Sequence, residues 1–235
     1  FEEYEKKLIL NGKKLSLLNN RYKKKISDFS EIEFKVFSQW GEDGIIDWII
    51  SKLKHIPKIF LEIGTEDYTE SNTRYLLQNR NWSGYLIEGD ETSVKKIKKS
   101  RIFWKHDIKA INAFLNTSNI NKVLKKLKVP RKIGLLSLDI DSIDYWILKK
   151  MTTLKPVIIV CEFNPLFGTK HEITVKYKEN FKRNEEHYSN LFYGASIQAF
   201  IKLLKVRNYL FLGTNSAGNN AFFVQKNYSK NIFKD

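Results

Sequence analysis

The sequence predicts an α/β fold built on a mostly parallel sheet of about seven strands, ending in an antiparallel hairpin strand. From residue 58 onward, short apolar runs alternate with segments of helical period, the pattern of βαβ units. The last two apolar runs are separated only by the turn "TNSAGNN", which is too short for a parallel crossover. With 235 residues and 42% hydrophobic content, the chain can form one large domain with a substantial core.

The first 35 residues are expected to be a separate basic, helical segment. They are Lys-rich and weakly periodic, and Leu8, Leu15, Leu18 and Tyr22 would form an apolar stripe that packs on the main domain or on a partner. An oligomer formed through this stripe is one expectation. Because the chain starts at Phe1 rather than Met, we also expect residues to precede it.

Residues 36–235 are expected to form the main domain. After the turn-like "SQWGEDG", the run "IIDWIISKL" predicts a helix that starts near Asp43 or Gly44. The predicted strands are 58–64, 83–90, 102–107, 132–141, 155–164, 209–213 and 221–226. The predicted helices between them are 71–80, 91–101, 111–128, 143–151 and 195–207. The polar insertion at 165–194 follows the fifth strand, where it would cover an acceptor site.

The composition limits the class of protein. A net charge of +15 is compatible with a solvated lysine surface, nucleic acid, a membrane surface or a phosphorylated ligand. The lysines are dispersed and do not alternate with aromatic residues in a dense block, so nucleic acid is disfavoured. The longest apolar runs have about six residues, so no membrane span is expected. The single cysteine, Cys161, lies in such a run and indicates a reducing, cytoplasmic setting.

Five consecutive predicted strands end in a carboxylate. In an open α/β sheet the ligand binds beyond the carboxyl ends of the strands. Five acids at one rim are difficult to explain by solvation alone, because like charges placed together repel. The sequence therefore predicts a binding site at this rim. The five residues are Glu62, Glu88, Asp107, Asp139 and Glu162.

The turn after the first strand indicates the kind of ligand. It offers one glycine, Gly64, followed by Glu66 and Asp67, and this disfavours a pyrophosphate, which needs close backbone approach and positive dipoles. The absence of Gly-x-Gly-x-x-Gly also excludes a dehydrogenase of the common type. Glu88 ends the second strand about 24 residues later, a position suited to binding two ribose hydroxyls. These features favour a nucleoside with a cationic tail, such as S-adenosylmethionine.

Several motifs together resemble a known family. "FLEIG", "YLIEGD", "HD", "LLSLDID" and "GNNAFFV" resemble the class I S-adenosylmethionine-dependent methyltransferases, which have a Rossmann-like fold. Within that class, "FSQWGEDGI", "LDIDSIDYW" and "EFNPLFG" are similar to FkbM-related enzymes of surface-polysaccharide and secondary-metabolite gene clusters. The resemblance covers about residues 36–226. It departs from the class at the first turn, where Glu66 or Asp67 replaces a second glycine.

The resemblance implies a cofactor site. The residues it places around S-adenosylmethionine are Gln39, Gly41, Glu62, Gly64, Thr65, Asn72, Glu88, Asp107 and Asp139. In this arrangement Glu62 and Gly64 lie under the methionine portion and Glu88 binds the ribose. Asp107 would contact the adenine amino group, and the segment containing Gln39 and Gly41 would close over the tail.

A second group of residues suggests a metal and acid–base chemistry. Asp139 after the fourth strand, with Glu162 and Asn164 after the fifth, resembles the oxygen ligands by which catechol-type methyltransferases hold magnesium. Mg²⁺ or Mn²⁺ would suit such ligands and would lower the pKa of an acceptor hydroxyl. Asp139 and Asp141 are also candidate catalytic residues. The alternative is that Asp141 or Asp144 caps the following helix.

His187, in the insertion, is the first candidate for a general base, because histidine titrates near neutral pH. The alternative is a loop histidine with no chemical role.

The sequence thus favours a methyltransferase that acts on a small-molecule, sugar or nucleotide-linked acceptor, mainly by O-methylation, in surface-polysaccharide (capsule) modification. A basic protein of this kind is compatible with an anionic acceptor. Two alternatives remain. One is a nucleic-acid base methyltransferase, favoured by the charge of +15. The other is a non-catalytic nucleotide-binding or assembly module, against which the acids at the strand ends argue.

Overall fold

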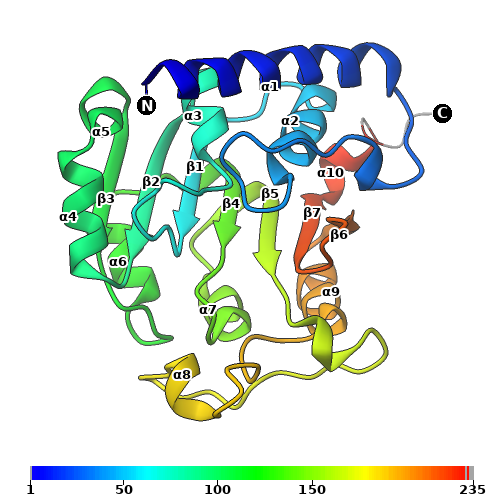
Figure 1. The fold of residues 1–235 in the computed structure, drawn as a ribbon. Helices are drawn as coiled ribbons and strands as arrows, with labels where there is room; N and C mark the ends of the chain where they lie inside the picture. Colours follow the sequence, from blue (N-terminus) through cyan, green and yellow to red (C-terminus); the bar gives the residue numbers. More distant parts are fainter. Residues whose placement is uncertain (1, 231, 233–235) are drawn as a thin grey trace.

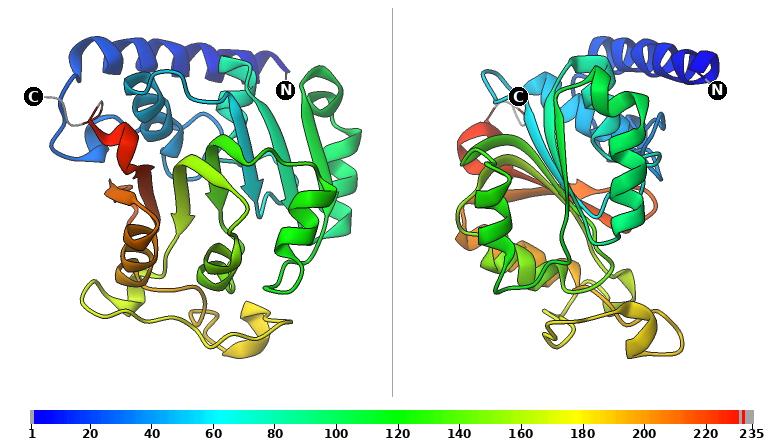
Figure 2. Two further views of the ribbon diagram at one scale, coloured as in Figure 1. Left: turned by 180° about the vertical axis from the view of Figure 1, so that it is seen from behind. Right: turned by 90° about the vertical axis from the view of Figure 1, so that its left-hand side faces the viewer.

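The computed structural model describes residues 2–230 and 232, and arranges them in three layers, with helices on both faces of one sheet (Figures 1 and 2). The sheet has seven strands in the order β3-β2-β1-β4-β5-β7-β6. They are β1 (Ile59–Ile63), β2 (Ser83–Glu88), β3 (Ile108–Asn112), β4 (Lys132–Leu138), β5 (Lys155–Glu162), β6 (Tyr209–Thr214) and β7 (Asn220–Gln225).

The direction of the strands confirms the predicted fold class. The first five strands are parallel, and β7 lies antiparallel to both β5 and β6. The central strands β4 and β5 are buried along nearly their whole length, which explains their continuous apolar sequences.

Two hydrophobic clusters cover the two faces of the sheet. One cluster joins the sheet to α2 (Glu42–Lys52), α3 (Arg74–Arg80) and α4 (Glu91–Lys99). The other joins it to α6 (Ile120–Lys126), α7 (Asp144–Lys150) and α9 (Ile197–Val206). The remaining elements are η1 (Phe29–Glu31), η2 (Pro165–Phe167), α8 (Arg183–Glu186) and α10 (Lys226–Ser229). Among the described residues, no helix is both long and apolar enough to cross a membrane.

The prediction of the third strand was wrong. Residues predicted as a strand at 102–107 form the helix α5 (Arg101–Lys105), and the strand β3 begins only at Ile108. Because β3 is an edge strand paired only with β2, it needs no continuous apolar run, and its sequence "IKAIN" gave a weak signal. The helix predicted at 111–128 is correspondingly shorter, since its first residues belong to β3 and only 120–126 are helical.

The amino-terminal segment contains the helix α1 (Glu2–Tyr22), and the residues of its predicted stripe divide between the domain and the surface. Leu8 and Ile9 pack against a small cluster that includes Phe34 and Tyr75. Leu15, Leu18 and Tyr22 are exposed instead.

Candidate functional site

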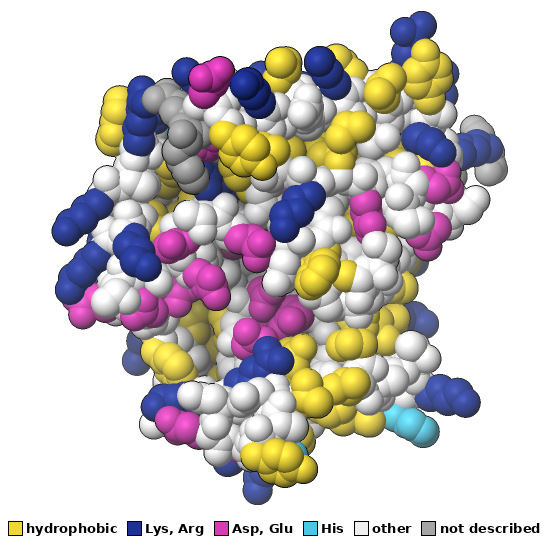
Figure 3. Space-filling view, viewed as in Figure 1, with side chains coloured by type: hydrophobic (Ala, Val, Ile, Leu, Met, Phe, Trp, Pro, Cys, Tyr) yellow, Lys and Arg dark blue, Asp and Glu magenta, His cyan; other side chains and the backbone are white. Residues whose placement is uncertain are grey.

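A cavity of about 620 Å³ lies at the carboxyl ends of the parallel strands. Its floor includes the ends of β1 and β4, between which the strand order reverses, and ligands of open α/β sheets bind at such a switch point. Nine of the predicted site residues line it: Gln39, Glu62, Gly64, Thr65, Asn72, Glu88, Asp139, Asp141 and Glu162. In Figure 3 acidic side chains gather in the hollow at the centre of this face.

Glu62 is buried and holds the neighbouring loop in place. Its carboxylate accepts hydrogen bonds from the Ser71 hydroxyl (2.6 Å) and the Asn72 backbone N–H (2.9 Å), and from the Thr73 hydroxyl. Burial raises the pKa of Glu62, and these hydrogen bonds oppose the rise. The carboxylate therefore fixes the loop that presents Asn72 to the cavity, where the Asn72 amide donates to the Ser137 hydroxyl (3.1 Å).

Gly64 is required by the contact between two strand ends. Its φ is +80°, and a Cβ atom there would lie 1.5 Å from the backbone oxygen of Asp139. The backbone N–H of Asp139 in turn donates to the carbonyl of Ile63 (3.0 Å). The glycine thus allows the end of β1 to approach the end of β4.

Glu88 joins the turn after β1 to the end of β2. One carboxylate oxygen accepts from the backbone N–H groups of Thr65 and Glu66, both at 2.8 Å, and the other accepts from that of Asp90 (2.9 Å). A carboxylate oxygen carries two lone pairs, so the oxygen bound only by Asp90 can accept a further hydrogen bond. Glu88 is therefore held at the cavity wall with capacity for a hydroxyl donor.

Asp107 is not at this rim. It precedes β3, at the amino-terminal ends of β2 and β3, where its carbonyl accepts from the N–H of Gly84, so the structure places it away from the cavity in which the adenine contact was predicted. The residue that ends β3 is Asn112, whose amide donates to the carbonyls of Glu88 (3.1 Å) and Gly89 (2.8 Å). Phe114 follows and lines the cavity half-exposed. Phe114 lies in "INAFL", a segment that the sequence analysis interpreted as part of a helix.

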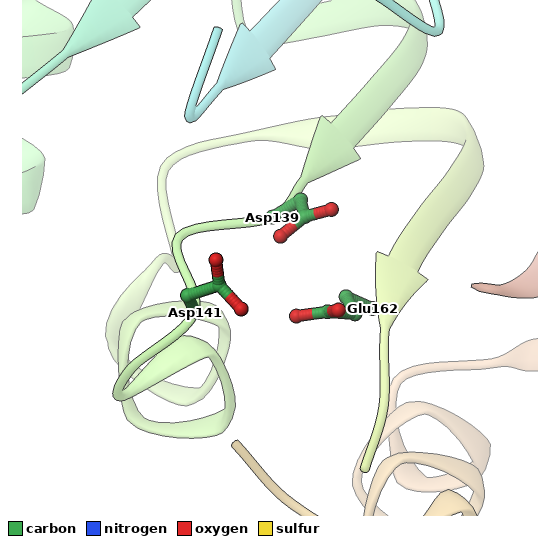
Figure 4. Close-up of side chains that lie close together, drawn as sticks. All are labelled: Asp139, Asp141 and Glu162. Carbon is green, nitrogen blue, oxygen red and sulfur yellow. The ribbon is translucent and has the colours of Figure 1, made fainter. Parts of the chain in front are cut away.

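Three carboxylates converge at the ends of β4 and β5: Asp139, Asp141 and Glu162 each place an oxygen within 4.8 Å of the others (Figure 4). Burial and the neighbouring carboxylates raise the pKa of both Asp139 and Glu162, and a hydrogen bond joins their side chains. Such a bond between two carboxyl groups requires one proton. At least one member of this pair is therefore protonated in the folded protein.

The insertion supplies a cation to this cluster. Arg183, in α8, forms an ion pair with Asp141, and its guanidinium lies 3.8 Å from the ring centroid of Tyr193. Arg183, Tyr193 and the buried Phe181 all line the cavity. The insertion at 165–194 therefore forms part of the cavity wall.

Asn164, predicted as a metal ligand at the acceptor end of the cavity, makes its side-chain hydrogen bonds within the insertion. Asn164 is fully buried, and its amide donates to the carbonyls of Leu191 (2.9 Å) and Tyr193 (3.0 Å) and accepts from the N–H of Leu166 (3.0 Å). It holds the insertion together and does not line the cavity formed by the described residues, so its role as a metal ligand stays a prediction without support from these contacts.

His187 is exposed at the end of α8, with its Nδ1 atom 2.7 Å from the Ser189 hydroxyl. It does not line the cavity formed by the described residues, so the structure supports the interpretation as a loop histidine. Asp144 is the first residue of α7 but does not cap it, since the N-cap is Ile143 and no side chain makes a capping hydrogen bond. Its buried carboxylate accepts from the N–H groups of Ile140 (2.9 Å) and Ser142 (3.0 Å), and burial raises its pKa to about 6.

The part of the cavity wall formed by the segment before α2 is held in place by Glu42. No pattern in the sequence identified this residue. This fully buried carboxylate accepts from the backbone N–H of Trp40 (2.9 Å) and from the side-chain amides of Asn215 (2.8 Å) and Asn220 (2.9 Å). It thereby ties the Gln39–Trp40 segment to the β6–β7 hairpin. Gly41 itself is the N-cap of α2, with φ +112°, and does not line the cavity, although the adjacent Trp40 does.

Asn220 offers a hydrogen-bond acceptor to the cavity. Because the carboxylate of Glu42 can only accept, the Asn220 amide must direct its nitrogen to Glu42. Its Oδ1 atom is then buried without a hydrogen-bond partner among the described residues, and Asn220 lines the cavity directly across the ladder from Glu162. A buried acceptor of this kind favours a ligand that carries an N–H or O–H donor. In the sequence, "GNNAFFV" marked this position only as part of a family resemblance.

No protein-family model matches the chain, and no curated protein matches its sequence. Among solved structures, the chain is similar to a "putative caffeoyl-CoA O-methyltransferase" from Staphylococcus aureus, with a TM-score of 0.51, 16% identity, and coverage of 92% of this chain and 99% of that one. It is also similar to the N-terminal domain of EvdMO1 crystallised with SAH and D-fucose (TM-score 0.46, 10% identity, 78% and 80% coverage). The fold is therefore that of class I methyltransferases.

Replacing Gly64 by alanine should destabilise the protein by about 3 kcal/mol or more, because the new methyl group would collide with the Asp139 carbonyl. Urea unfolding measures this change. Gly218→Ala is the matched control, since Gly218 also has a positive φ (+72°) but has nothing within 4 Å of the position that a Cβ atom would take. The control should lose only about 1–2 kcal/mol. Equal losses in the two variants would show that the strand contact at Gly64 is unimportant.

The proton shared by Asp139 and Glu162 should make stability depend on pH. Both folded-state pKa values lie above the ordinary carboxyl range, so the contribution is complete below about pH 4 and declines as the pH rises through neutral. Glu162→Gln removes one titrating group and should reduce the loss of unfolding free energy between pH 5 and pH 8 by about 1–2 kcal/mol. Glu91→Gln, on the exposed surface of α4, should leave the loss unchanged. An unaltered pH dependence in Glu162→Gln would contradict the shared proton.

Proposed function

We propose that this protein is an S-adenosylmethionine-dependent methyltransferase acting on a small-molecule acceptor. The observation that carries the proposal is one continuous cavity at the β1–β4 switch point, which is lined by Glu88 on one side and by the carboxylate cluster of Asp139 and Glu162 on the other. The first region suits a cofactor and the second an acceptor, and the two are adjacent.

In this proposal the cofactor lies along the ends of β1 and β2. Glu88 accepts the ribose hydroxyls with its remaining lone pairs, and Phe114 stacks on the adenine in place of the expected contact from Asp107. The methionine tail runs past Gly64 and Thr65 toward Asn72 and Gln39. The negative charge of the surrounding carboxylates favours the cationic amine and sulfonium over a phosphate.

The acceptor lies at the ends of β4 and β5 under the insertion. Methyl transfer is an in-line displacement at sulfur, so the enzyme chiefly positions the acceptor and removes its proton. When the Asp139–Glu162 pair has lost one proton, its ionised carboxylate can accept the proton of an acceptor hydroxyl while the protonated member donates a hydrogen bond. This chemistry supports O-methylation, with the carboxylate pair as the general base in place of His187.

A divalent cation also fits the carboxylate cluster. Asp139, Asp141 and Glu162 bring three oxygen donors together, the ligand type that Mg²⁺ and Mn²⁺ prefer, and the positive charge would reduce their repulsion. When bound, the cation would lower the pKa of the acceptor hydroxyl. Asp141 would then have to exchange its ion pair with Arg183 for the metal, and Arg183 would become available to an anionic group on the acceptor.

A sugar or nucleotide-linked acceptor in surface-polysaccharide modification is the narrower form of the proposal. It rests on the motifs "FSQWGEDGI" and "EFNPLFG", together with the basic Lys182 and Arg183 at the acceptor end of the cavity. A nucleic-acid base is disfavoured as the acceptor because the hollow is predominantly acidic and would repel a phosphate backbone (Figure 3).

Calorimetric titration with S-adenosylhomocysteine tests the cofactor site. Micromolar binding is expected, and Glu88→Ala should weaken it by at least about 100-fold, because the ribose hydroxyls would lose their acceptor and the turn at 65–66 its anchor. Glu91→Ala, three residues further on the exposed surface of α4, should bind like the unaltered protein. No binding by the unaltered protein would overturn the methyltransferase proposal.

A separate Mn²⁺ titration tests the metal. Binding heat is expected for the unaltered protein and should be lost in Asp139→Asn and in Asp141→Asn, which each remove one carboxylate ligand. Glu70→Gln is the control, since Glu70 lines the same cavity outside the cluster. If Mn²⁺ gives no heat while S-adenosylhomocysteine binds, the metal proposal is wrong and the methyltransferase proposal stands.

A further inference from the structure

The outer surface of α1 exposes an unusual number of large apolar side chains. Tyr4, Leu10, Leu15, Leu17, Leu18 and Tyr22 are between 43% and 71% exposed. Single exposed leucines are ordinary on a protein surface, but six such residues on one 21-residue helix form an extended patch.

The inner surface of the same helix is mostly polar. The Glu5 carboxylate accepts from Arg74 (2.8 Å) and Gln78 (2.7 Å), and the Ser16 hydroxyl donates to Asp47 (2.5 Å). Gly12 lies so close to the domain that a Cβ atom would be 2.5 Å from Val36. These specific contacts fix the rotation of the helix. Leu8 and Ile9 pack inward, and the six exposed apolar residues therefore face outward.

Basic residues lie among the exposed apolar ones. Residues 6–27 contain eight lysines and arginines and no acidic residue. Lys7, Lys14 and Arg21 recur every seven residues and therefore share one side of the helix, between a row containing Leu10 and Leu17 and a row containing Leu18. Figure 3 shows basic and apolar side chains, with an acidic side chain among them, along the top of the molecule.

We propose that the outer face of α1 binds the surface of an anionic lipid bilayer, lying in its plane. Interfacial helices combine lysines and arginines, which attract acidic headgroups, with leucines and aromatic residues that enter the headgroup boundary. Both components are present on α1, and the exposed Tyr4 and Tyr22 stand near its two ends. A straight helix on the outside of the domain presents this combination to a flat surface (Figures 1 and 2).

Charge argues against a second copy of the chain as the occupant. Pairing two α1 helices in parallel through this face would place the rows of Lys7, Lys14 and Arg21 together, and the acidic Glu3 on the same side is already paired with Lys7 (3.4 Å). An acidic surface would instead neutralise the positive charge of this basic row. The α1 helix lies beyond the starts of the parallel strands and the cavity at their carboxyl ends, so the bilayer would leave the cavity mouth open (Figures 1 and 3).

Co-sedimentation with vesicles tests the proposal. The full chain should bind vesicles of phosphatidylcholine with one-quarter phosphatidylserine at least tenfold more strongly than phosphatidylcholine alone, and added salt should weaken the binding. Two variants should each lose at least tenfold: Lys7→Glu/Lys14→Glu/Arg21→Glu, and Leu10→Ser/Leu17→Ser/Leu18→Ser. All six side chains are exposed, so thermal unfolding should show both variants folded.

The matched control is Lys95→Glu/Lys98→Glu/Lys99→Glu on α4, which makes the same change in charge on a helix with no large exposed hydrophobic among its residues. It should bind vesicles nearly as well as the unaltered chain. An equal loss in this control, or binding independent of phosphatidylserine, would overturn the proposal. So would failure to bind vesicles together with a dimer that the leucine variant abolishes, which would make the patch a self-interface. S-adenosylhomocysteine affinity, measured on the same variants, should not change.

Discussion

The close contact between the ends of β1 and β4 organises the rest of the site. Gly64 allows the backbone of one strand to reach the Asp139 carbonyl of the other, and the Asp139–Ile63 hydrogen bond closes the contact. On one side of this junction, the turn at 65–66 is anchored by Glu88. On the other side, Asp139 reaches Glu162. Both halves of the cavity are therefore positioned by one backbone approach that a side chain at Gly64 would prevent.

A rim with so many carboxylates is stable because each is compensated differently. Hydroxyl groups and a backbone N–H surround Glu62, and backbone N–H groups hold Glu88. Asp139 and Glu162 share a proton, and Asp141 pairs with Arg183. The first two arrangements are local and rigid. The proton between Asp139 and Glu162 and the ion pair between Asp141 and Arg183 can instead be replaced by a proton acceptor, a cation or an acceptor substrate. The residues able to take part in chemistry are therefore concentrated at the ends of β4 and β5.

The polar contacts beneath α1 also separate residues that hold the structure from residues that face outward. Glu5 and Ser16 use their hydrogen bonds to orient the helix on the domain, while its leucines and lysines remain outside. The positive charge of the chain is thus available on the outer surface, away from the acidic cavity. Separation of the two charges in space allows a basic protein to keep an acidic binding site.

The sequence by itself determined the sheet, its parallel and antiparallel parts, and the carboxylates at the ends of β1, β2, β4 and β5, because apolar runs and their terminal residues are local properties of the chain. It misplaced Asp107, since an edge strand such as β3 has no continuous apolar run. Only the tertiary structure decided that Arg183 reaches Asp141, that Asn220 reaches Glu42, and that the side chains of Asn164 and His187 make hydrogen bonds within the insertion. Those outcomes depend on contacts between residues far apart in the chain and on the direction of each side chain, neither of which has a local pattern.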